Sequence, residues 1–225
     1  MTFSKKILLF LKNLDLDSNL PGEVEVMNPF KHKITFNLCE KFYTKYYSDN
    51  RPRHLILGIN PGRFGGGLTG IPFTDPIRLQ SVCSIENDLQ KKQELSSVFI
   101  YEMIQSFGGP EMFYRYFYIS SISPLGFTRH NKNLNYYDDK QLETRIKNFV
   151  IDCMEKQLRF GINTKVAFCL GEGKNFAYLS KLNAEMNFFD KIVALPHPRF
   201  IMQYKLKKKE EYIQRYLCEL KPVTV

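Results

Sequence analysis

The stretch Leu55-Ile56-Leu57-Gly58-Ile59-Asn60-Pro61-Gly62 is an apolar run that ends abruptly in an asparagine and a proline-glycine turn. A short, continuously apolar run is typical of a strand buried on both faces of a parallel sheet, so we expect a strand over residues 53–59. Downstream, Gly70-Ile71-Pro72-Phe73 places an aromatic side chain after another proline. This layout predicts that Asn60 and Phe73 present one polar group and one flat apolar face to the same small pocket, which suits a flat ring such as a nucleobase.

Three further runs predict strands, and helical patterns separate them. The strands are expected over residues 116–122, 164–170 and 191–195. Helices are expected over residues 86–107, 138–160, 172–182 and 201–220, preceded by two N-terminal helices around residues 5–14 and 34–47. Strands that alternate with helices imply right-handed crossovers and parallel pairing. The predicted fold is therefore α/β in three layers, with a short four-stranded parallel sheet flanked by helices.

The 225 residues contain no internal repeat, low-complexity tract or linker, which predicts a single domain over residues 1–225. Within it we expect N-terminal helices over residues 1–50, the sheet and its loops over residues 51–200, and a basic C-terminal helix over residues 201–225.

The composition argues against several classes of protein. No run of 18 apolar residues occurs, so no membrane-spanning helix is expected, and the N-terminal residues lack the small-residue cleavage site of a signal peptide. The five cysteines form no Cys-x-x-Cys pair, which argues against a zinc or iron–sulfur site. We expect a cytoplasmic monomer with free thiols, no membrane association, and no metal or cofactor.

The charge balance favours a polyanionic partner, with nucleic acid first among them. The formal net charge is +9 and the isoelectric point is about 9.2. The densest basic cluster is Lys205-Leu206-Lys207-Lys208-Lys209, which fits either a DNA-facing patch or a solvated helix face.

Ligands of an open parallel sheet bind beyond the carboxyl ends of its strands, so the loops after the four runs are expected to form the site. The first loop, residues 60–67, has three consecutive glycines that allow close approach to a ligand or form a mobile turn. It lacks the Gly-Lys-Ser/Thr ending of a phosphate-binding loop. The second loop contains Ser121 and Ser123, whose hydroxyls bind a base edge or a phosphate, or bond to local backbone groups.

The third and fourth loops add a helix start and a histidine. Residues 170–174 open a helix, so their N–H groups and Lys174 are suited to a phosphate, although a plain strand-to-helix turn has the same pattern. In Leu195-Pro196-His197-Pro198-Arg199-Phe200 the two prolines fix φ on either side of the histidine. A histidine constrained at a strand end, where the site is expected, is a candidate functional group.

These blocks together resemble the uracil-DNA glycosylase superfamily. Gly58-Ile59-Asn60-Pro61-Gly62 and its spacing to Gly70-Ile71-Pro72-Phe73 are similar to the first motif of two branches, the mismatch-specific branch and the single-strand-selective monofunctional branch. Leu195-Pro196-His197-Pro198 resembles the His-Pro motif of the single-strand-selective branch, and Gly171-Glu172-Gly173-Lys174 looks like its Gly-x-Gly-Arg loop. The nearest fit is a bacterial offshoot of the single-strand-selective branch.

The resemblance implies a monofunctional DNA glycosylase that hydrolyses the N-glycosidic bond of uracil or related deaminated bases in DNA, without metal or cofactor. It assigns catalysis to Asn60 and His197. It also implies two sets of binding residues: base-binding Ile59, Gly62, Phe64, Phe73 and Ser121, and DNA-binding Arg63, Ser123, Lys174 and Arg199. Two departures stand out: Ser121 replaces an asparagine that reads the uracil edge in the family, and the His-Pro motif is shorter here, since His-Pro-Ser-Pro-Arg in the family becomes His197-Pro198-Arg199.

Two other readings remain open from the residues. One is a nucleic-acid-binding protein of the same fold without excision activity, which the serine at position 121 and the shortened motif allow. The other is an α/β hydrolase or nucleotide enzyme, although the chain has neither a Gly-x-Ser-x-Gly elbow nor a dinucleotide fingerprint. The sequence leaves open the base and strand preference, the role of Asp75, and the role of the polar, aromatic segment over residues 131–137.

Overall fold

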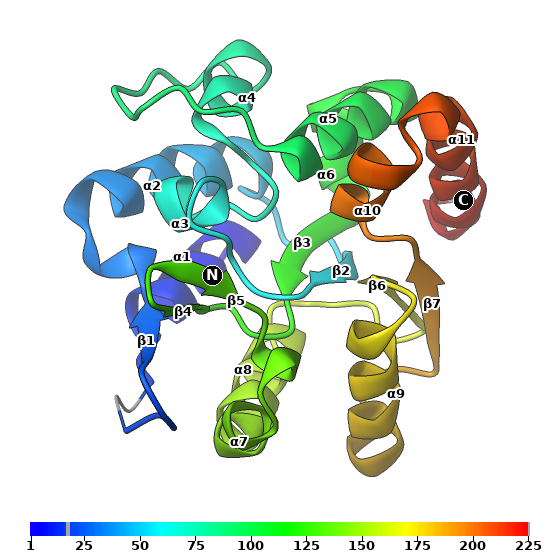
Figure 1. Ribbon diagram of the computed structural model, residues 1–225. Coiled ribbons are helices and arrows are strands. Elements are labelled where there is room, and N and C mark those ends of the chain that lie inside the picture. Colours follow the sequence, from blue (N-terminus) through cyan, green and yellow to red (C-terminus); the bar gives the residue numbers. More distant parts are fainter. Residues whose placement is uncertain (17–18, 225) are drawn as a thin grey trace.

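The computed structural model describes residues 1–16 and 19–224 and contains a parallel sheet of four strands (Figure 1). The strands are β2 (His54–Gly58), β3 (Phe117–Ser121), β6 (Val166–Leu170) and β7 (Lys191–Leu195). Their order across the sheet is β3-β2-β6-β7, and every neighbouring pair is parallel. The predicted α/β fold with a short four-stranded parallel sheet is confirmed.

Helices cover both faces of this sheet, which explains why two of its strands are buried along their whole length. All five residues of β2 are buried, and so are all five of β3. In Figure 1, α7 (Lys140–Arg145), α8 (Lys147–Leu158) and α9 (Lys174–Met186) lie below the sheet. Above it lie α5 (Leu95–Phe107), α6 (Pro110–Tyr116), α10 (Pro198–Tyr204) and α11 (Lys209–Leu220).

The remaining helices all belong to the first third of the chain, between Phe3 and Ser81. They are α1 (Phe3–Lys12), α2 (Lys33–Tyr46) and the short helices α3 (Gly66–Thr69) and α4 (Pro76–Ser81). Single 3₁₀ turns cover Pro29–Lys31, Tyr136–Asp138, Leu206–Lys208 and Lys221–Thr224. Of the helices within residues 1–16 and 19–224, none is long and apolar enough to cross a lipid bilayer.

Three of the predicted helices differ from the structure. The expected helix over residues 86–107 begins only at Leu95, because Glu94 is extended, with φ −109° and ψ 126°. The expected helix over residues 138–160 is interrupted at Ile146 and forms α7 and α8. The expected helix over residues 201–220 is two helices, because α10 ends at Tyr204 and α11 begins at Lys209.

A second, antiparallel sheet was not predicted. It consists of β1 (Val24–Met27), β4 (Gly126–Arg129) and β5 (Lys132–Leu134), in the order β1-β4-β5. His130 and Asn131 join β4 to β5 with positive φ values of 49° and 58°, as a two-residue hairpin turn requires. The hairpin brings the segment after Leu134 against the end of β2.

The chain order of the strands places a switch point between β2 and β6. The chain leaves β2 toward β3 on one side, whereas it leaves β6 toward β7 on the other. At such a point the loops diverge and leave a crevice at the carboxyl edge of the sheet. This crevice lies between the loop that begins at Asn60 and the loop that begins at Gly171.

Candidate active site

A cavity of about 520 Å³ lies at the carboxyl ends of β2, β6 and β7. Asn60 and Gly62 line it from the loop after β2, residues 171–175 from the loop after β6, and His197 from the loop after β7. Phe73 and Glu94 also line it. The structure therefore brings the two predicted catalytic residues and the predicted stacking residue into one site.

The side chain of Asn60 is held in a single orientation by main-chain groups. Its Nδ2 donates to the carbonyl of Leu134 at 3.1 Å, and its Oδ1 accepts from the N–H of Tyr136 at 3.1 Å. An amide oxygen has two lone pairs, so Oδ1 retains one for a further donor, such as a water molecule. The segment over residues 131–137 thus has a role that the sequence left open: it fixes the orientation of Asn60.

Tyr136 connects this segment to the loop after β6. Its buried hydroxyl donates to Oδ1 of Asn175 at 2.8 Å, and Nδ2 of Asn175 donates to the carbonyl of Leu170 at 3.0 Å. The chain of hydrogen bonds joins the ends of β2 and β6 across the switch point. Neither Tyr136 nor Asn175 was predicted as a site residue, because their partners are distant in sequence and no local pattern identifies them.

Two hydrogen bonds fix the position of His197 and of the proline before it. Its Nδ1 accepts from the N–H of Arg199 at 3.1 Å, and the carbonyl of Pro196 accepts from the hydroxyl of Tyr216. Burial and the nearby Arg199 guanidinium lower the pKa of His197 to about 4, so the ring is neutral at pH 7. Because Nδ1 accepts, the single ring proton lies on Nε2, which is left to donate.

Gly171 allows the loops after β6 and β7 to approach each other. Its N–H donates to the carbonyl of Leu195 at 2.7 Å, and its φ of +118° is one that other residues rarely adopt. A Cβ at this position would lie 3.3 Å from the Cβ of Asn175. The glycine therefore keeps the histidine loop close to the rest of the site.

Phe73 forms a flat apolar wall of the cavity. Its backbone has a positive φ of 53°, which is rare outside glycine and common at functional sites. The ring lies over Gly58, where a Cβ would be only 2.7 Å from Cε2 of the phenylalanine. Its centroid is 5.9 Å from that of the His197 ring, and the two planes are inclined by 51°.

Ser121, predicted to bind the base, does not line the cavity. It is 4% exposed, and a Cβ added to Gly58 would lie 3.4 Å from its Oγ and close to the Phe73 ring. Among the residues that the structure describes, its hydroxyl makes no hydrogen bond. Ser121 thus lies next to Phe73 and Gly58 but does not reach the cavity in this structure.

Ser123 does not fit its expected contact with DNA. The residue is fully buried, and its hydroxyl donates to the carbonyl of Leu125 at 2.8 Å. Its position after a strand suggested an exposed hydroxyl, but the following residues fold back over it. Here the alternative reading, a local bond to the backbone, describes the structure.

Arg63 and Phe64 also lie outside the cavity. The N–H of Arg63 donates to Oδ1 of Asn133 at 3.1 Å, and the ring of Phe64 is 38% exposed. Lys92 Nζ lies 3.5 Å from the centroid of this ring, and the guanidinium carbon of Arg63 lies 5.2 Å from it. The pair forms a basic, aromatic surface beside the cavity.

Cationic and aromatic side chains surround the mouth of the cavity. Lys174 and Arg199 are exposed there. Phe200 and Tyr204, one turn apart on α10, are 43% and 72% exposed and have ring centroids 5.7 Å apart. Exposed aromatic rings beside a basic rim are suited to single-stranded or distorted nucleic acid.

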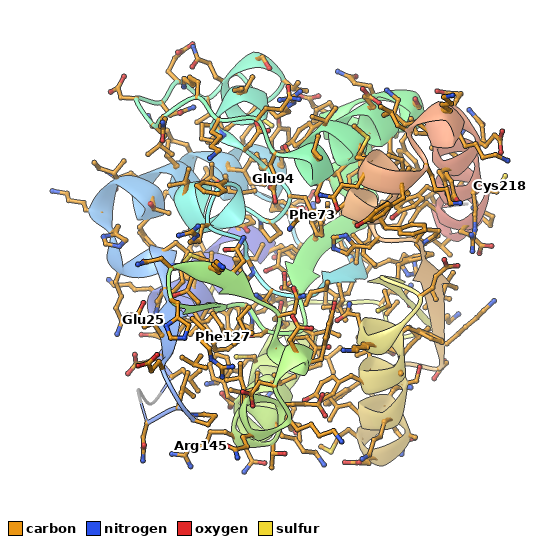
Figure 2. All side chains as sticks on the ribbon, in the orientation of Figure 1. Glu25, Phe73, Glu94, Phe127, Arg145 and Cys218 are labelled. Atoms are coloured by element: carbon orange, nitrogen blue, oxygen red, sulfur yellow. The ribbon has the colours of Figure 1, made fainter. Side chains whose placement is uncertain are left out.

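Glu94 is a site residue that the sequence did not reveal. Its carboxyl lines the cavity, and burial together with the charge of Asp75 raises its pKa to about 7, against the opposing effect of Arg199. Figure 2 shows Glu94 and Phe73 near each other, where α5 begins. The residue was expected inside a helix, where nothing distinguishes it from the other charged residues nearby.

Asp75, whose role the sequence left open, anchors this region. It is fully buried and caps α4, since Oδ1 accepts from the N–H of Arg78 at 2.8 Å. Its Oδ2 accepts from the N–H of Glu94 at 2.9 Å.

No group of three or more His, Cys, Asp or Glu side chains within residues 1–16 and 19–224 is placed to hold a metal ion.

The arrangement combines a flat wall, a fixed neutral hydrogen-bond donor and a fixed amide oxygen. Phe73 is able to stack on a planar ring, and Nε2–H of His197 is able to stabilise negative charge that develops on that ring. Asn60 is able to hold a water molecule in the same cavity. Such a set suits the departure of an anionic planar group and its replacement by water.

Comparison with known proteins identifies the family to which this chain belongs. The family model described as the uracil DNA glycosylase superfamily matches residues 44–221. The chain is also similar to a crystal structure of wild-type SMUG2 from Pedobacter heparinus, with 54% sequence identity and a TM-score of 0.97. That similarity covers 100% of this chain and 99% of the other. This chain therefore belongs to the uracil DNA glycosylase superfamily.

Proposed function

We propose that this protein is a monofunctional DNA glycosylase that hydrolyses the N-glycosidic bond of uracil, or a related deaminated base, in DNA. The observation that carries the proposal is the pairing in one cavity of a neutral histidine donor with an asparagine fixed by two hydrogen bonds. Membership of the superfamily and the similarity to SMUG2 support the same activity.

The reaction begins when the target nucleotide leaves the DNA stack and its base enters the cavity. Extrusion costs a few kcal/mol, which contacts inside the site must offset. Stacking on Phe73 contributes about 1–3 kcal/mol. Because Gly58 has no side chain, the Phe73 ring is able to pack closely against the end of β2 and form one wall of the cavity.

Cleavage of the N-glycosidic bond leaves positive charge on the sugar and negative charge on the base, as in the oxocarbenium transition states of glycoside hydrolysis. Nε2–H of His197 donates to the base oxygen on which this negative charge develops. The donor is fixed before the reaction by Arg199 N–H and the flanking prolines, so little reorganisation is needed.

Water then attacks the sugar carbon from the side of Asn60. The free lone pair of Oδ1 orients the water, while Leu134 and Tyr136 hold the amide in place. A neutral amide does not deprotonate water as a carboxylate does. The reaction therefore depends more on stabilisation of the departing base than on activation of the nucleophile.

The surface around the cavity holds the DNA. Lys174 and Arg199 neutralise phosphates at the mouth, and Arg63 extends the basic surface along the first loop. Phe200, exposed on α10 next to Arg199, is placed to fill the gap that the extruded base leaves in the stack. The protein acts as a monomer in the cytoplasm and needs no cofactor.

Phe73→Ala tests the stacking role. We expect the dissociation constant for DNA that contains a uracil analogue resistant to cleavage to rise about 5- to 100-fold, because the stacking contribution is lost. The binding is measured by fluorescence anisotropy, with uracil-free DNA as the reference. The thermal unfolding midpoint should change little; a collapsed protein would instead show that Phe73 is a core residue.

Excision itself is tested on labelled oligonucleotides with one uracil, in single- and double-stranded form, followed by alkali and gel electrophoresis. We expect strand cleavage at the uracil position and none in oligonucleotides with cytosine or thymine there. A mobility shift without cleavage would indicate a binding protein of this fold. Neither a shift nor cleavage would favour a different substrate class.

A further inference from the structure

A carboxyl group in a glycosylase cavity requires an explanation, because both the substrate and the departing base are anionic. Glu94 lines the cavity together with Asn60 and His197, and its side chain is only partly exposed. An ionised carboxylate there would repel the DNA phosphates and the base anion. The role of Glu94 therefore depends on whether its carboxyl carries a proton.

The surroundings of Glu94 fix its main chain but provide no hydrogen-bond donor to its carboxyl group. The main-chain N–H of Glu94 donates to Oδ2 of the buried Asp75 at 2.9 Å. Among the described residues, neither carboxyl oxygen accepts a hydrogen bond or forms an ion pair. Carboxylates that are charged in proteins are normally bound by such groups. Without such partners, burial favours the neutral acid.

The side chain packs directly against the loop that follows Asn60. A Cβ on Gly65 would lie 1.8 Å from Oε2 of Glu94, and a Cβ on Gly62 would lie 3.8 Å from Oε1. A side chain at position 65 would displace the carboxyl from this position. Because Gly62 also has no side chain, the carboxyl is able to reach the part of the cavity that this residue lines.

The charged groups around the cavity act on Glu94 in opposite directions. Asp75, at the start of α4, raises the pKa of Glu94 beyond the effect of burial, and Arg199 of α10 lowers it; the balance is a pKa of about 7. His197 is neutral. Lys174 is exposed at the rim, and Glu172 there is paired with Arg215.

Bound DNA shifts this balance toward the acid. The phosphates add negative charge and cover Arg199, and the departing base adds a further negative charge inside the cavity. Both effects favour the protonated carboxyl. A protonated Glu94 would present its O–H as a hydrogen-bond donor, as buried protonated carboxyls do in other oxyanion sites.

We propose that Glu94, as a carboxylic acid, donates a hydrogen bond to a carbonyl oxygen of the extruded base from the side of Gly62 and Gly65. This inference rests on the proposed glycosylase function. The negative charge of a departing uracil is spread over its two carbonyl oxygens, so Glu94 serves one oxygen and His197 the other. The base is held between two neutral donors, which compensates for the absence of an asparagine at position 121, where Ser121 does not line the cavity.

The pH dependence of excision follows from this role. Below the pKa the carboxyl donates; above it the ionised group cannot donate and repels the base anion. Single-turnover excision of uracil should therefore fall as pH rises through a value at or above about 7. His197, with a pKa of about 4, does not titrate in that range.

Glu94→Gln distinguishes the role, because glutamine keeps the size and an N–H donor but does not titrate. We expect the Glu94→Gln enzyme to lose the fall at high pH and to exceed the wild type about tenfold at pH 9. Glu94→Ala should be slower than both at pH 6. Glu86→Gln, which changes an exposed carboxylate in the segment before α5, should keep the wild-type profile.

Three outcomes would overturn the assignment. If the wild type excises uracil and Glu94→Gln keeps its pH profile, Glu94 has no part in the reaction. If wild-type excision rises with pH and Glu94→Gln abolishes the rise, Glu94 is instead a base that accepts a proton from water. If the wild type excises nothing at any pH, both the proposed function and the role of Glu94 are wrong.

Discussion

Replacing His197 with alanine should slow the release of uracil about 100- to 1,000-fold at neutral pH, which is the usual cost of removing one donor from an oxyanion site. The imidazole is neutral, so its contribution comes from the fixed Nε2–H and not from a positive charge. The rate is measured in single turnover with enzyme in excess, so that product release does not limit it.

Two variants control this prediction. His197→Gln retains an N–H donor and should recover part of the lost rate. His32→Ala changes an exposed histidine that does not line the cavity, and should leave the rate unchanged. A His197→Ala enzyme with the wild-type rate would show that the base departs without help from this residue.

Asn60→Ala should reduce the single-turnover rate at least tenfold, and about 100-fold if the water is positioned by this side chain alone. The substitution removes the oxygen that holds the water, and it also leaves Leu134 C=O and Tyr136 N–H without their partners. DNA binding should be nearly unchanged, because Asn60 acts on the nucleophile.

The matched control is Asn37→Ala, which changes an exposed asparagine on α2.

The Asn60→Ala variant itself should be less stable than the wild type. The loss of the two hydrogen bonds of Asn60 should cost about 1–3 kcal/mol of folding free energy. The assay temperature must therefore lie well below the melting temperature of Asn60→Ala. A variant that is fully folded and excises uracil at the wild-type rate would exclude the proposed role of Asn60.

The parts of the site that lie at strand ends could be predicted from the sequence. A continuously apolar run specifies a buried parallel strand, and parallel strands direct their carboxyl ends to one edge. Asn60 and His197 each follow such a run, so their meeting in one cavity follows from the fold class alone. Phe73 was predictable because its spacing from Asn60 matches the family motif.

The residues that depend on contacts between distant segments could not be predicted. β1 pairs with β4 about a hundred positions later in the chain, and this pairing places residues 134–136 on Asn60. Glu94 was hidden in a charged segment that resembles the start of a helix but is extended. A serine that follows a strand is typical of an exposed loop, yet here the chain folds back and the carbonyl of Leu125 accepts a hydrogen bond from the Ser123 hydroxyl.

The most direct test of the account is to measure free uracil and alkali-sensitive strand breaks together, in a single-turnover reaction with uracil-containing DNA. We compare the wild type with a double variant that combines Asn60→Ala and His197→Ala. The account predicts equal amounts of free uracil and strand breaks from the wild type, and neither from the double variant over the same time. Equal release by both enzymes, or no free uracil from the wild type, would contradict it.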